Sequence, residues 1–116
     1  MSGGQSTTAK GKSAEQRAAA FLQARGYHVL ACNLRLPGGE IDLVCRDGRT
    51  LVFVEVKFRQ STRFGSALNA VDARKRATLR RLAADYAQFV APRARVRFDV
   101  VALDGERVSV YRNAFS

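Results

Sequence analysis

The chain has 116 residues, 47% of them hydrophobic, and a formal net charge of +10. This length predicts one domain, and the hydrophobic content is enough to bury a core, which excludes a wholly disordered chain. No apolar run reaches the roughly 18 residues that a membrane span needs, and the Gly/Ser/Thr-rich start lacks the apolar stretch of a secretory signal. We expect a cytoplasmic protein with no membrane partner, with residues 1–12 as a flexible tail and residues 13–116 as a single domain.

The first predicted element is a helix. Ser13 followed three residues later by Gln16 is the pattern of a capping box, so the helix is expected to begin at Ser13. It runs through about Arg25, and Gly26 suits the left-handed position just beyond a helix end.

Short apolar runs bounded by turn residues then predict three strands, at residues 27–31, 40–46 and 50–59. Apolar residues at three- and four-residue spacing predict a second helix over residues 68–90. Two more strands follow, at residues 95–103 and 107–111. This order predicts an α/β domain with a mixed central β-sheet flanked by helices.

Side-chain alternation divides the strands of the central hairpin into two faces. In strand 50–59 one face is wholly apolar and is expected in the core: Val52, Val54, Val56 and Phe58. The other face carries Phe53, Glu55, Lys57 and Arg59. In strand 40–46 the apolar face consists of Ile41, Leu43 and Cys45, and the opposite one of Glu40, Asp42 and Val44.

Two registers are open for this hairpin. A two-residue turn at Asp47-Gly48 places Asp42 beside Phe53, and a four-residue turn places it beside Glu55. In both registers Asp42, Glu55 and Lys57 share one face, because cross-strand neighbours point the same way. Neighbouring carboxylates repel unless a divalent cation joins them, and hard oxygen ligands favour Mg²⁺ or Mn²⁺. An ordinary cross-strand ion pair on a solvated face is the alternative interpretation.

Glu15 gives a second, independent indication. On a helical wheel it shares a face with the small apolar residues Ala18, Ala19 and Leu22, so it projects toward the element that the helix packs against. A buried acid needs a partner or a metal ion. The alternative is that Glu15, close to the predicted helix start, only complements the helix dipole.

The positive charge is concentrated in the second half of the chain. Residues 58–97 hold ten cations and two acids. A pI near 10.8 indicates an anionic partner, most often nucleic acid, although an ordinary solvated basic surface has the same composition. The expected nucleic-acid contacts are Arg59, Arg63, Lys75, Arg76 and Arg80. Asp99 is a further candidate acid, with pairing to Arg97 or Arg35 the favoured interpretation.

Ordered short motifs extend over nearly the whole chain: AExxAAxxL (14–22), GY (26–27), NLR (33–35), GEIDLV (39–44), FVEVKFR (53–59), RFDVV (97–101) and NAF (113–115). With these motifs the chain resembles the YraN family, small bacterial proteins that are predicted endonucleases. That family is similar to archaeal Holliday-junction resolvases of the PD-(D/E)XK nuclease superfamily.

The resemblance implies a restriction-endonuclease-like three-layer fold and a set of site residues. Asp42 corresponds to the signature aspartate, Glu55-Val56-Lys57 to (D/E)XK, and Glu15 to the first-helix glutamate. It implies that Mg²⁺ or Mn²⁺ is held by Asp42, Glu55 and the Val56 backbone carbonyl, with Glu15 as a further ligand or water-orienting group. Two departures are Ala14, where the family usually has glycine, and Ile41, where the superfamily pattern has proline.

The expected function is therefore metal-dependent hydrolysis of phosphodiester bonds by an endonuclease, with Lys57 positioning the nucleophile. DNA is the expected partner, branched or junction DNA included, and a homodimer follows by analogy with the resolvases. The alternative is a nucleic-acid-binding protein that keeps the fold without catalysis.

Overall fold

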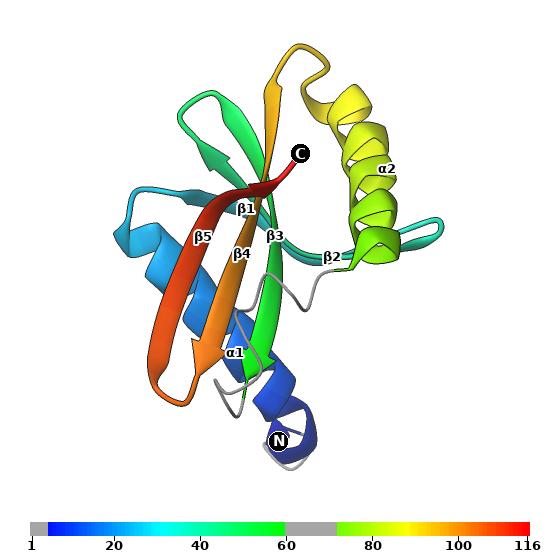
Figure 1. Cartoon of the computed structure of the whole chain (residues 1–116). Coiled ribbons are helices and arrows are strands. Elements are labelled where there is room, and N and C mark those ends of the chain that lie inside the picture. The colour runs from blue at the N-terminus through cyan, green and yellow to red at the C-terminus, as the bar shows by residue number, and fades with distance from the viewer. Residues whose placement is uncertain (1–4, 60–71) are drawn as a thin grey trace.

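A mixed five-stranded sheet forms the centre of the protein (Figure 1). The computed structural model describes residues 5–59 and 72–116, with side chains described for 14–58 and 72–116. The strands are β1 (His28–Leu36), β2 (Gly39–Asp47), β3 (Thr50–Arg59), β4 (Arg95–Asp104) and β5 (Arg107–Phe115). They lie in the order β1-β2-β3-β4-β5, and β3 and β4 are the parallel neighbours. The predicted element order and the mixed sheet are confirmed.

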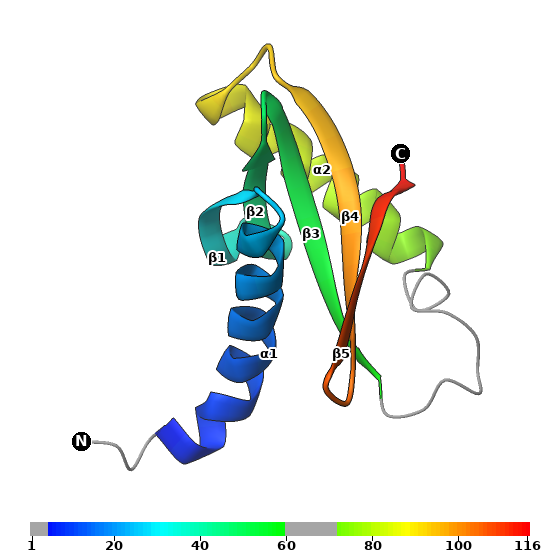
Figure 2. The same ribbon diagram turned by 90° about the vertical axis from the view of Figure 1, so that its left-hand side faces the viewer.

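Two helices cover opposite faces of this sheet (Figure 2). Helix α1 (Gln5–Ala24) precedes β1, and α2 (Ala73–Val90) lies in the connection between the parallel strands β3 and β4. The result is three layers, the arrangement expected of a restriction-endonuclease-like fold. Within residues 5–59 and 72–116, neither helix is long and apolar enough to cross a membrane.

Each helix packs against its own half of the core. On the α1 side, Leu22 is fully buried against Leu43, Val52 and Val101. Each such buried aliphatic side chain contributes about 2 kcal/mol to folding. On the α2 side the core is more aromatic, and its members include Phe53, Leu79, Leu82, Phe98, Val100 and Phe115. Because β3 is covered on both faces, it is the most buried strand of the hairpin that carries the acidic motif.

Two predictions about the core faces need correction, and a third is largely confirmed. Ile41 and Val44 both pack on the α2 side, whereas Leu43 and Cys45 pack on the α1 side, so strict alternation along β2 is broken at Asp42. Phe58, expected in the core, is 55% exposed close to the end of β3. Of the predicted apolar face of β3, Val52 and Val54 are buried, and Val56 is partly buried.

The helix starts also differ from prediction. Helix α1 begins at Gln5, eight residues before Ser13, so Ser13 lies inside the helix and does not cap it. Glu15 is then far from the first turn, which removes the helix-dipole explanation because that effect fades within one turn. Helix α2 begins at Ala73, where the Asp72 side chain accepts a hydrogen bond from the Lys75 backbone N–H at 2.9 Å.

The turn between β1 and β2 brings that hairpin against α2. A Cβ atom on Gly39 would lie 2.9 Å from a methyl carbon of Leu82, so only glycine allows this close approach. The Arg81 guanidinium donates to the carbonyls of Pro37 and Gly38 in the same turn. The hairpin that carries Asp42 is thereby held against α2.

Candidate active site

The Asp42 side chain replaces a backbone hydrogen-bond acceptor at the end of the β2–β3 ladder. The strands pair from Asp47 and Thr50 to Leu43 and Val54, which is the second of the two predicted registers. Extended by one residue, this register places Asp42 level with Glu55. The next free N–H of β3, that of Val56, donates to the Asp42 carboxylate at 2.9 Å.

Two lysine side chains form ion pairs with the Glu55 carboxylate. Alternation along β3 directs it to the α2 side of the sheet, where its side chain is 5% exposed. Its Oε2 atom is 3.3 Å from the Lys57 ammonium nitrogen and 3.6 Å from that of Lys75 on α2. Among the residues that the structure describes, none forms a hydrogen bond with its buried Oε1 atom. One carboxylate oxygen is thus held by two cations, and the other has no partner among these residues.

The two carboxylates oppose each other electrostatically. Burial, and next the charge of Glu55, raise the pKa of Asp42 from 3.8 to about 6. The hydrogen bond from Val56 and the charge of Lys75 act in the opposite direction, but they do not cancel this rise. Ionisation of both carboxylates therefore carries an electrostatic cost.

Glu15 adjoins this pair from α1. Its charge contributes to the raised pKa of Asp42, so the two groups interact across the α1–sheet boundary. Burial raises the pKa of Glu15 itself, a hydrogen bond from the Asn33 side chain lowers it, and Glu40 raises it further. In the part of the chain that the structure describes, no three His, Cys, Asp or Glu side chains form a metal-binding group. The structure thus brings Asp42 and Glu55 together as a pair, and Glu15 acts on Asp42 through its charge.

The predicted nucleic-acid contacts separate into different environments. Lys75 lies in the site itself, through its contact with Glu55. Arg76 is half-buried, with its guanidinium 5.6 Å from the centre of the Phe115 ring. Arg80 is exposed and donates to the Ser116 backbone carbonyl at 2.8 Å.

Two of these predicted contacts cannot be placed. Arg59 is the last residue of β3, but its side chain lies outside the described part, as does Arg63 entirely. Arg74, next to Lys75, has an exposed side chain at the start of α2.

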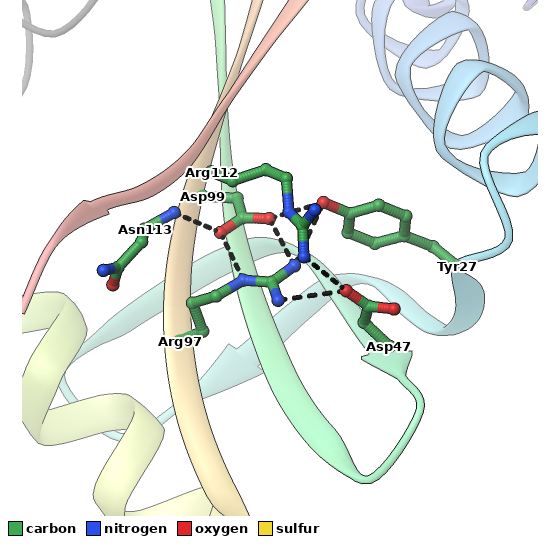
Figure 3. Close-up of polar contacts among 6 residues, drawn as sticks. All are labelled: Tyr27, Asp47, Arg97, Asp99, Arg112 and Asn113. Carbon is green, nitrogen blue, oxygen red and sulfur yellow. Dashed lines mark hydrogen bonds and ion pairs between the residues drawn. The ribbon is translucent and has the colours of Figure 1, made fainter.

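Asp99 belongs to a separate network (Figure 3). It is fully buried and accepts hydrogen bonds from the Tyr27 hydroxyl at 2.7 Å, from Arg97 at 2.9 and 3.0 Å, and from the Asn113 backbone N–H at 2.9 Å. Arg97 also reaches Asp47 at 3.0 Å. Pairing of Asp99 with Arg97, the favoured prediction, is confirmed, and Arg35 has no part in these contacts. Through Tyr27, the network links the segment between α1 and β1 to β4, to β5 and to the end of β2.

Asn33 is the site residue that the sequence interpretation overlooked. The predicted strand ended at Ala31, whereas β1 continues to Leu36. Asn33 has a left-handed backbone with φ of 53°. The available signal was an asparagine between apolar strand residues, since asparagine adopts this conformation more readily than most side chains do.

Comparison with known proteins identifies relatives along almost the whole chain. The model of the family described as "Uncharacterised protein family UPF0102" matches residues 14–103. A UPF0102 protein of Shewanella loihica is 46% identical over 106 residues, which cover 91% of this chain and 93% of that one. UPF0102 proteins of Dechloromonas aromatica and Symbiobacterium thermophilum are each 46% identical, over 95% and 90% of this chain and 91% and 94% of their own.

Proposed function

The chain belongs to the UPF0102 family, and for this member we propose metal-dependent endonuclease activity that hydrolyses phosphodiester bonds in DNA, branched DNA included. The observation that carries the proposal is the pair of Asp42 and Glu55 beneath two lysines, in a chain with a net charge of +10. A surface that only binds a polyanion gains nothing from adjacent carboxylates with a raised pKa. Phosphodiester hydrolysis uses both the acids and the cations.

The residues present fit a divalent cation. The unpaired Oε1 atom of Glu55 is a buried acceptor, and such groups are costly unless a partner is supplied. Burial first and the charge of Glu55 second raise the pKa of Asp42, and a bound cation would offset both effects. Mg²⁺ and Mn²⁺ typically use one or two protein carboxylates and keep several waters, so a pair is sufficient.

The Val56 carbonyl is a further candidate ligand. In an extended strand the N–H and C=O of one residue point to the same edge, and the Val56 N–H points to Asp42. The Val56 carbonyl is therefore on the Asp42 side, beyond the last β2–β3 pair. Asp42, Glu55 and this carbonyl would hold the cation, and Glu15 would lie at its margin.

The chain's own residues then divide the work of hydrolysis. When bound, the cation lowers the pKa of a water molecule and stabilises negative charge on the phosphate. The Lys57 ammonium, beside Glu55, holds the attacking water and offsets charge that develops on the phosphate oxygens. Lys75, whose side chain is 41% exposed, meets the incoming phosphate at the edge of the site. Glu15 orients the water from the α1 side.

The sequence resemblance supports the same assignment. Asp42 and Glu55-Val56-Lys57 occupy the signature positions of the YraN family and the PD-(D/E)XK nucleases, and Glu15 occupies the first-helix position. We include in the proposal that this chain is a nuclease of that group.

A substrate panel tests the proposal. Labelled linear duplex, flap and four-way-junction DNA would be incubated with the protein in Mg²⁺ or Mn²⁺, with and without EDTA. We expect cleavage that EDTA abolishes and that Glu55→Gln lowers at least about a hundredfold. Asp85→Asn is the matched control, because Asp85 is an exposed acid on α2 away from the carboxylate pair. Salt-sensitive binding of DNA with no cleavage would support the non-catalytic alternative instead.

A further inference from the structure

The conformation of Asn33 is unusual for the middle of a strand. Its φ of 53° is left-handed, although β1 continues on both sides of it. Cys32 pairs with Leu43 and Leu34 pairs with Ile41, so Asn33 lies across from Asp42. Backbone conformations of this kind concentrate at functional sites.

The Asn33 side chain contacts the other acid of the site. Its amide forms a hydrogen bond with the Glu15 carboxylate, and because this bond favours the ionised acid, the amide is the donor. Asn33, Glu15, Gln16 and Cys32 line a cavity of about 220 Å³ between α1 and β1. Asn33 is therefore the link that joins α1, through Glu15, to the strand position opposite Asp42.

We propose that Asn33 is a positioning residue that holds the Glu15 carboxylate toward the Asp42–Glu55 pair. Its left-handed backbone directs the side-chain amide of Asn33 toward α1, and this amide holds the Glu15 carboxylate against the sheet. The consequence for catalysis rests on the proposed function, whereas the consequence for metal affinity does not require turnover. Groups that orient the residues around a metal ion typically alter affinity or activity by 10- to 100-fold.

The chain supplies its own control for a purely conformational role. Asn113 in β5 has the same φ of 53°, at an irregularity in the pairing of β4 with β5. Its backbone N–H bonds Asp99, in the network away from the carboxylate pair. Glycine tolerates left-handed φ, so Asn33→Gly removes the amide and keeps the backbone conformation, and Asn113→Gly makes the same change elsewhere.

The experiment is a double-mutant cycle between Asn33→Gly and Glu15→Gln. Calorimetric titration would give the dissociation constant for Mn²⁺, and single-turnover cleavage of a labelled four-way junction would give the rate constant and the DNA concentration for half-maximal rate. We expect Asn33→Gly to weaken Mn²⁺ binding and slow cleavage about tenfold each, with half-maximal DNA concentration unchanged. In the Glu15→Gln background, Asn33→Gly should have no further effect. Asn113→Gly should alter neither quantity.

The outcomes separate the two proposals. Equal losses from Asn33→Gly with and without the Glu15 carboxylate, or no loss at all, would overturn the positioning role while leaving the nuclease proposal intact. The expected Mn²⁺ cycle without any DNA cleavage would support the positioning role and contradict the nuclease proposal. If the wild-type protein bound no Mn²⁺, both proposals would be wrong.

Discussion

The backbone N–H of Val56 donates to the side chain of Asp42 at 2.9 Å, one step beyond the last pair of the β2–β3 ladder. The Asp42 carboxylate accepts the hydrogen bond that a neighbouring strand would otherwise accept, so β3 holds Asp42 in place. The same contact leaves Asp42 beside Glu55 with a pKa of about 6. Structure and candidate chemistry therefore depend on the same atoms.

Asp42→Asn should stabilise the metal-free protein at neutral pH. Folding raises the pKa of Asp42 from 3.8 to about 6, so the folded protein binds this proton more tightly than the unfolded chain does. The stability that the protonated Asp42 gives is fully present below pH 3.8 and is lost as the pH rises through about 6. Asparagine can still accept from Val56 but carries no charge. We expect roughly 2 kcal/mol of added stability at pH 7, and almost none below about pH 4.

Urea unfolding in EDTA at the two pH values measures this difference. The same variant should lose the rise in unfolding temperature that Mn²⁺ gives the wild-type protein. A less stable Asp42→Asn protein at pH 7 would show that the carboxylate pair is not under electrostatic strain.

Lys75→Gln should slow cleavage about tenfold, since this ammonium contacts Glu55 Oε2 at 3.6 Å. Arg74→Gln removes a neighbouring exposed cation on the same helix turn and should weaken DNA binding only slightly, with the maximal rate kept. Single-turnover rates at saturating DNA distinguish the two. Equal effects of both variants on DNA binding alone would make Lys75 an ordinary phosphate contact.

The Asp99 network predicts a separate alkaline transition. Burial and the bond to Asp99 raise the pKa of Tyr27 from 10.0 to about 12. The folded protein therefore binds the Tyr27 proton more tightly than the unfolded chain does. The stability that this proton gives is present below pH 10 and is lost as the pH rises toward 12. Tyr27→Phe should lose about 1–2 kcal/mol at pH 7 and should show less of this alkaline loss.

Unfolding by urea across that range gives the comparison, with cleavage per folded molecule expected to be unchanged. Loss of catalysis in a fully folded Tyr27→Phe protein would mean that the network acts on the site.

Gly39→Ala should destabilise the protein by about 1–3 kcal/mol, because its Cβ would meet Leu82 at 2.9 Å. Gly48→Ala is the informative comparison. No atom of residues 14–58 or 72–116 lies within 4 Å of a Cβ there, but φ is +64°, so backbone strain is its main cost. Thermal unfolding of both variants measures the two effects. If Gly39→Ala proved neutral, the hairpin would not depend on close contact with α2.

The order of the elements and the bounds of β3 could be predicted from the sequence, because apolar runs and turn residues mark them. Strand β3 was predicted with the bounds that the structure gives, and the turn chemistry left two registers, one of which is observed. The shared face of Asp42, Glu55 and Lys57 follows from that register. Local patterning was sufficient here because the central part of β3, from Leu51 to Glu55, is buried on both faces.

The misses lie where the backbone departs from regular geometry. The predicted strands ended before Asn33 and Asn113, because asparagine is unfavourable in regular strands. In the structure β1 and β5 continue through these residues, since asparagine tolerates the left-handed conformation found there. The break in alternation at Asp42 depends on contacts with both helices. The approach of Lys75 to Glu55 depends on the placement of α2, which no pattern in the strands encodes.

The single-turnover rate of DNA cleavage at saturating Mn²⁺, compared between wild type and Glu55→Gln, tests the central claim most directly. Glutamine preserves the shape of Glu55 while removing the charge with which the proposed site would hold a cation. Cleavage by the wild-type protein, with a rate at least about a hundredfold lower in Glu55→Gln, is the predicted result. Equal rates for the two proteins, or no Mn²⁺-dependent cleavage by wild type on any DNA of the panel, would contradict it.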